Sequence, residues 1–95
     1  MMKVVVRGVL LYSDRGALIP EETVVLEREP ENVHDTNAVK VMRVHHDTGR
    51  HEHVGYIQAE KAADVSARLL ETPGVVCSVV PPLNPVEGVI KIEWE

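Results

Sequence analysis

The sequence predicts a mainly β fold: a small, closed or nearly closed six-stranded β-barrel with one inserted α-helix. Valine occurs eighteen times and phenylalanine not at all, and β-branched side chains favour strands. The apolar stretches are short and separated by turn formers, and a single segment, residues 59–70, has a helical period. Six short strands with one helix after the fourth fit a barrel better than a sandwich.

Length and charge limit the function classes. A chain of 95 residues is expected to form a single domain, residues 1–95, which is too small for a motor ATPase or a Rossmann enzyme. The balance of 10 Lys+Arg against 15 Asp+Glu gives a net charge of −5, which disfavours diffuse binding along a phosphate backbone. Any nucleic-acid contact should therefore be local. No apolar run approaches the roughly 20 residues that span a bilayer, so we expect a cytoplasmic protein without a membrane partner.

The first half of the chain contains four predicted strands. The first covers residues 3–12, and its apolar character indicates burial on both faces or a bend, for which Gly8 is the natural place. The second covers residues 23–28. The third and fourth, residues 38–46 and 53–58, form a hairpin through residues 47–50, where Gly49 can take a positive φ.

The second half contains the helix and two strands. The predicted helix, residues 59–70, has a buried face formed by Ala59, Ala62, Ala63, Ser66, Leu69 and Leu70. The fifth strand ends at Val80, and the proline-rich segment 81–85 is expected to be a stiff connection. The last strand alternates, with Gly88, Ile90, Ile92 and Trp94 on one face. We expect Trp94 and the single cysteine, Cys77, to belong to the core.

The loop between the second and third strands, residues 29–38, concentrates polar side chains. Two interpretations are open. Asn and Asp side chains can accept hydrogen bonds from backbone N–H groups and hold an irregular loop. Alternatively, Asn32 and Asp35 could bind a ligand hydroxyl or a base edge. Spacing alone favours the structural interpretation.

Four sequence segments carry a family resemblance. They read G-V-L-L-Y at 8–12, V-L-E-R-E-P at 25–30, N-V-H-D-T-N-A-V-K-V at 32–41 and V-G-Y-I at 54–57. Together they resemble the HIRAN domain, over nearly the whole chain. The resemblance implies an OB-like form of the barrel. It also implies a non-catalytic module that recognises single-stranded DNA 3′ ends in DNA repair or replication-fork processing, and that can act with an ATPase or nuclease partner in trans.

The resemblance also implies a nucleic-acid-binding site formed by Tyr12, Asn32, His34, Asp35 and Tyr56. Asp35 is the candidate acceptor for the terminal 3′ hydroxyl. His34 stands where the family has an aromatic residue, and Leu10 and Leu11 stand where it has an Arg-Tyr pair. Each lost base stack is expected to weaken binding by about 1 to 3 kcal/mol. Spacing alone leaves open whether the two tyrosines line a pocket or fill the barrel.

Basic residues near these segments are Arg7, Arg15 and Lys40, each either a phosphate contact or a solvated surface charge. No nucleophile elbow or glycine-rich phosphate loop occurs, so catalysis is not expected and no cofactor or metal is assigned.

Two alternatives remain. The negative charge and the leucines at positions 10 and 11 favour a protein-interaction adaptor on the same barrel, without DNA binding. The segment 45–53 holds four histidines and two carboxylates around the predicted hairpin, where His51, His53 and a cross-strand histidine could form a transition-metal site.

Overall fold

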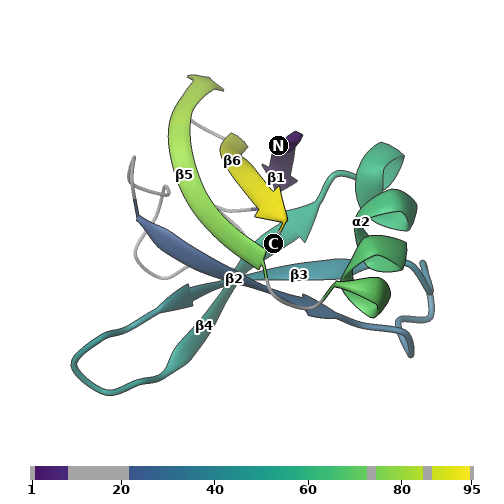
Figure 1. Cartoon of the computed structure of the whole chain (residues 1–95), viewed down its shortest axis with the longest axis horizontal. Coiled ribbons are helices and arrows are strands. Elements are labelled where there is room, and N and C mark those ends of the chain that lie inside the picture. The colour runs from purple at the N-terminus through teal and green to yellow at the C-terminus, as the bar shows by residue number, and fades with distance from the viewer. Residues whose placement is uncertain (1, 9–21, 73–74, 85–86, 95) are drawn as a thin grey trace.

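A computed structural model describes residues 2–8, 22–72, 75–84 and 87–94. Its elements in chain order are β1 (Met2–Arg7), β2 (Thr23–Arg28), β3 (Val39–Val44), β4 (His51–Ile57), α2 (Ala59–Glu71), β5 (Val75–Asn84) and β6 (Glu87–Trp94). The strands form a closed antiparallel barrel in the order β1-β4-β3-β2-β5-β6 (Figure 1). The prediction of a six-stranded, mainly β barrel with one helix is therefore confirmed for the described part of the chain.

Branched aliphatic side chains fill the barrel. The side chains with the largest volumes among the fully buried ones are Val4, Val6, Val24, Val39, Val41, Val54, Val65, Val79, Ile90 and Ile92. Each contributes roughly 1.5 to 3 kcal/mol of transfer free energy on burial. In β1 the valines at positions 4 and 6 are buried while Lys3 and Arg7 are exposed. Of the two alternatives for the first strand, burial on both faces is therefore wrong for β1, and the bend at Gly8 remains. Residues 9–12 of that predicted strand lie outside the described residues.

Turns and a close approach between strands explain three glycines. Gly8 and Gly49 take positive φ values of 82° and 72°, as expected for the bend after β1 and for the β3–β4 hairpin. Gly55 lies in β4, next to the residues that pair with β1. A Cβ at this position would lie 2.7 Å from both the carbonyl oxygen of Arg7 and Cγ1 of Val6. Only glycine allows the two backbones to approach this closely.

Helix α2 covers one end of the barrel, beside the loop that joins β2 to β3 (Figure 1). Its buried residues are Ala62, Val65 and Ser66, and Leu69 packs against the core. The predicted face is therefore partly wrong: Val65 replaces Ala59, Ala63 and Leu70, which are exposed. Positions 62, 65, 66 and 69 follow the 3.6-residue period more closely, and Leu70 lies a further 100° around the axis. No helix in the described ranges is both long and apolar enough to cross a membrane.

Strand β5 is longer than expected. It continues beyond Val80 to Asn84, which pairs with Glu87 of β6 after a register shift. The expected stiff connection at 81–85 is thus a strand as far as position 84. Proline is tolerated in a strand where the ladder is irregular. The alternation predicted for the last strand is confirmed, with Ile90 and Ile92 fully buried and Trp94 packed against the core.

Two buried features stabilise the barrel wall. Cys77 is 3% exposed, as expected for a core cysteine, and burial raises the pKa of its thiol to about 11. Arg43 of β3, with a side chain 6% exposed, forms ion pairs with Glu22 and with Glu52, whose Oε1 lies 3.7 Å from a guanidinium nitrogen. Nε2 of His45 donates a hydrogen bond of 3.0 Å to the same Oε1. The barrel therefore carries a buried group of charged side chains outside its aliphatic core.

Candidate functional site

The polar loop 29–38 is held by its own side chains. Oδ1 of Asn32 accepts hydrogen bonds from the backbone N–H groups of His34 (2.9 Å) and Asp35 (3.0 Å). Oδ1 of Asp35 accepts one from the N–H of Asn37 at 2.8 Å. A backbone bond of 2.9 Å from the N–H of Glu29 to the carbonyl of Ala38 closes the base of the loop. The structural interpretation of the loop residues is therefore correct.

A carboxylate at the start of the loop joins it to the barrel. Oε1 of Glu29 accepts hydrogen bonds from Nδ2 of Asn32 (2.6 Å) and from the hydroxyl of Tyr56 (2.9 Å). Its Oε2 lies 3.4 Å from Nζ of Lys40. The hydrogen bond from Asn32, followed by that from Tyr56, lowers the pKa of the Glu29 carboxyl below its usual value. Glu29 is therefore an ionised acceptor at neutral pH, and it sets the position of two predicted site residues.

A second contact orients the tyrosine ring. The rings of His53 and Tyr56 have their centroids 4.8 Å apart and an interplanar angle of 89°, an edge-to-face arrangement that stabilises both rings. Nε2 of His53 donates to the carbonyl oxygen of Gly55 at 3.0 Å. Burial lowers the pKa of His53, which favours the neutral ring at physiological pH. Tyr56 is thus fixed by its hydroxyl at one end and by a neutral imidazole at its side.

A pocket of about 380 Å³ opens between this loop, the paired residues of β1 and β4, and the start of α2. Its lining residues are Arg7, Asn32, His34, Asp35, Ala38, Tyr56, Ile57 and Ala59. The barrel closure brings these segments together, because Arg7 pairs with Tyr56 and the neighbouring residue, Val6, pairs with Ile57 in the β1–β4 ladder. The lining combines apolar residues with residues that carry carboxylate, amide, imidazole, phenol and guanidinium groups.

The structure brings four of the five predicted site residues to this pocket: Asn32, His34, Asp35 and Tyr56. Tyr12, the fifth, lies outside the described residues, as do Leu10, Leu11 and Arg15. Tyr56 lines the pocket rather than filling the barrel, which answers the question that spacing left open. Among the basic candidates, Arg7 lies at the pocket, whereas Lys40 forms ion pairs with Glu27 and Glu29 at 3.6 and 3.4 Å.

Sequence reasoning missed the part that Glu29 plays. It stands in the R-E-P segment of the motif, three residues before Asn32, and this spacing was the available signal. Its contact with Tyr56 spans 27 residues and depends on strand register, which the sequence does not give.

The hairpin histidines are dispersed. His45 is buried against Glu52, His53 contacts Tyr56, and His46 and His51 are exposed. Within the described ranges, no group of three or more His, Cys, Asp or Glu side chains is arranged to hold a metal ion. The structure therefore gives no support to the transition-metal alternative.

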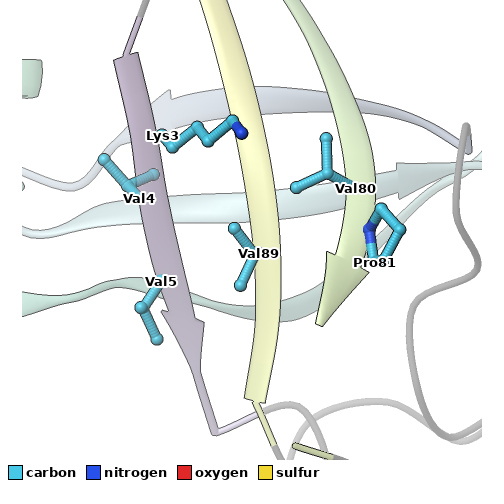
Figure 2. A pocket seen from close by; sticks show the side chains of 6 residues that line it. All are labelled: Lys3, Val4, Val5, Val80, Pro81 and Val89. Atoms are coloured by element: carbon cyan, nitrogen blue, oxygen red, sulfur yellow. The ribbon is translucent and has the colours of Figure 1, made fainter. Parts of the chain in front are cut away.

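A second hollow, of about 280 Å³, lies on the outer side of β1, β6 and β5. Figure 2 shows Val4 and Val5 on β1, Val89 on β6, and Val80 and Pro81 on β5, with Lys3 at one end. Lys3 is the one ionisable side chain among these lining residues. This hollow offers apolar contact and is lined by no predicted site residue.

A closed barrel with a pocket beside its polar loop defines a small β-barrel binding module. Comparison with protein families gives a match to the HIRAN domain over residues 1–90, so the chain belongs to the HIRAN domain family. Among solved structures it is similar to the crystal structure of the HIRAN domain of human HLTF, with a TM-score of 0.75 and 23% sequence identity, covering 98% of this chain and 73% of that one. No curated protein matches the sequence. The likeness to the human domain concerns the fold.

Proposed function

We propose that this chain is a non-catalytic module that binds the 3′ end of single-stranded DNA in the pocket beside loop 29–38. The observation that carries the proposal is the convergence of Asn32, His34, Asp35 and Tyr56 on one cavity. The resemblance to the HIRAN domain implies that these residues bind nucleic acid. The volume, about 380 Å³, lies at the small end of the roughly 300 to 1,000 Å³ typical of ligand sites. It suits a terminal nucleotide rather than a long strand.

Asp35 supplies the end-reading chemistry in this proposal. Its Oδ1 is used by the N–H of Asn37, and within the described ranges no hydrogen bond reaches Oδ2. A carboxylate oxygen can only accept, so it favours a 3′ hydroxyl, which donates. A 3′ phosphate would instead place like charges side by side, which is unfavourable.

The remaining pocket groups suit the terminal nucleoside. The rings of His34 and Tyr56 provide flat surfaces against which a sugar or base can pack. The acidic net charge of −5 is compatible with this mode, because a site that reads one end needs few phosphate contacts. A role in DNA repair or fork processing, and an ATPase or nuclease partner in trans, follow from the family resemblance and belong to the proposal.

Fluorescence anisotropy tests the proposal with two labelled oligonucleotides that differ in a 3′ hydroxyl or a 3′ phosphate. We expect tighter binding of the hydroxyl form, and equal affinities would overturn the end-reading claim. Asp35→Asn keeps an oxygen for the N–H of Asn37 but removes the charge, so the preference should shrink while the melting temperature is retained. Asp64→Asn, an exposed change of the same kind on α2, is the matched control and should keep the preference.

The protein-interaction adaptor is the competing function, and the same experiment separates the two. If no oligonucleotide binds even at low salt and a pull-down with the folded chain captures a defined protein partner, the adaptor is favoured. Loss of folding in Asp35→Asn would show that Asp35 acts as a loop strut only.

A further inference from the structure

The outer surface of β1, β6 and β5 carries a row of valines that runs across the three strands. Val5 pairs with Val89, and Val89 pairs with Val80. All three are partly exposed and line the hollow of about 280 Å³, with Pro81 next to Val80 (Figure 2). Side chains that are in register on adjacent strands lie on one face of the sheet. The valine row therefore forms a continuous apolar surface that solvent reaches.

A pair of lysines lies beside the valine row. Lys3 pairs with Lys91 in the β1–β6 ladder, and each lysine is two residues from a valine of the row. Two residues along a strand span about 7 Å, and side chains at that spacing point to the same face. Like charges directly opposite each other destabilise a sheet. The barrel thus holds two ammonium groups together next to an apolar surface, although their repulsion is unfavourable.

The two lysines differ in their partners. Nζ of Lys91 lies 3.0 Å from Oε1 of Glu93. Lys3 is exposed, and among the described residues it forms no ion pair, whereas Lys40 and Lys91 do. Its side chain extends from β1 toward β6 (Figure 2). A lysine offers apolar methylene groups along its length and a charge at its end. Lys3 therefore suits a ligand that combines an apolar group with a carboxylate.

The size and the charge of this surface indicate which class of molecule it fits. A hollow of about 280 Å³ is slightly smaller than the roughly 300 to 1,000 Å³ of small-molecule sites, so it suits one or two side chains of a larger partner. Its described lining holds no aromatic ring on which a base could stack. The net charge of −5 also opposes a polyanion. A peptide with few carboxylates meets these conditions better than a nucleic acid.

We propose that the outer face of β1, β6 and β5 binds an extended peptide of a partner protein, in which an acidic residue and a branched apolar residue are two positions apart. In an extended peptide such side chains point to the same side, about 7 Å apart, which is the spacing between the lysines and the valines. The apolar side chain fills the hollow. The carboxylate lies between Lys3 and Lys91 and relieves their repulsion. This surface shares no lining residue with the pocket beside loop 29–38, so the inference goes beyond the proposed function and does not depend on it.

An NMR titration of the isotope-labelled chain tests the inference with short synthetic peptides that are capped at both ends. The probe peptide contains Glu-Ser-Leu, and two control peptides contain Gln-Ser-Leu and Glu-Leu-Ser in its place. We expect the probe to cause saturable shifts of the amides of Lys3, Val5, Val89 and Lys91. Both controls should bind about two- to fivefold more weakly, since the first loses the ion pair and the second loses the spacing. Equal affinities of the three peptides, or shifts confined to other residues, would overturn the proposal.

Two variants test the two kinds of contact separately. Lys3→Gln should weaken binding of the probe about two- to fivefold, whereas Lys61→Gln, the same change at an exposed position of α2, should not. Val89→Thr keeps the branched shape but adds a hydroxyl, so it should weaken binding about fivefold. Val76→Thr, at a position of β5 that is also exposed, is its control and should have no effect. Unchanged affinity in either Lys3→Gln or Val89→Thr would overturn the proposal.

The same variants identify the other possible occupants. A single-stranded oligonucleotide that shifts these amides more strongly than the probe would mark a nucleic-acid surface. A molar mass by light scattering that rises with concentration, and stays monomeric in Val89→Thr, would mark an interface between two copies of this chain. Either result would overturn the peptide proposal.

Discussion

The hydroxyl of Tyr56 donates a hydrogen bond of 2.9 Å to Oε1 of Glu29, across 27 residues of sequence. The same oxygen accepts the side-chain N–H of Asn32 at 2.6 Å. One carboxylate therefore fixes both the loop wall and the strand wall of the pocket. The shape of the candidate site depends on a residue that is not among its lining residues.

A double-mutant cycle measures this link. We expect Tyr56→Phe and Glu29→Ala to show a coupling of about 1 kcal/mol in the free energy of unfolding at pH 7, because each removes the same hydrogen bond. Urea denaturation of the four proteins gives the value. Pairing Tyr56→Phe with Glu31→Ala, an exposed carboxylate of the same loop, should give additive effects. Additivity in the Glu29 cycle would contradict the link.

Acid should weaken the coupling. The native pKa of Glu29 lies below its ordinary value of 4.5, so its ionised form stabilises the native state. That stability is fully present above the unfolded value and is lost as pH falls through the native pKa. Carbon NMR of the carboxyl group should show a titration midpoint below 4.5. A midpoint above it would show that the carboxylate is not held as described.

Loss of the buried guanidinium should destabilise the barrel. Arg43→Met removes the guanidinium that forms ion pairs with Glu22 and Glu52, whose side chains are 16% and 11% exposed. Breaking such a pair from one side costs about 3 to 5 kcal/mol. Arg50→Met on the exposed hairpin should cost within about 0.5 kcal/mol. Similar unfolding midpoints in urea for the two variants would contradict the buried ion pairs.

Alkaline pH should destabilise the protein through Cys77. The native thiol has a pKa of about 11 against 9.0 as its ordinary value, so the unfolded chain releases its proton first. The stability from this group is complete below pH 9.0 and is lost as pH rises to about 11, a change of about 2 to 3 kcal/mol. Unfolding free energies across this range should fall more steeply for the unmodified protein than for Cys77→Ala. Parallel curves would contradict the shift.

The positions of the strands could be predicted in part, because the residue patterns that mark them are local. The range 23–28 follows from a short run of β-branched and apolar residues closed by turn formers, and the inward face of β6 follows from a period-2 pattern. The helix face was less accurate, since Val65 lies among alanines whose burial depends on packing. The length of β5 was missed because prolines are read as breaks, although here they fall at an irregularity of the ladder.

The candidate site could be predicted from the sequence to a smaller extent than the strands. Asn32 and Asp35 are close in sequence, and the family motif marks them. Their proximity to Tyr56 and Arg7 arises from barrel closure, in which β1 pairs with β4 and β6. Patterns along one strand do not determine such registers, so neither Glu29 nor Arg7 could be placed before the fold was known.

Among the described residues, two pairs join β1 to β4, namely Val6 with Ile57 and Arg7 with Tyr56. The pocket is lined by Arg7 of β1 and by Tyr56 and Ile57 of β4, so a molecule bound there contacts both of the strands that pair at this position. Binding of a ligand in the pocket is then linked to folding of the barrel. A ligand at a hundred times its dissociation constant would add about 2.7 kcal/mol to the free energy of unfolding. A thermal-shift screen of short oligonucleotides can therefore report which ends this module accepts before any labelled probe is made.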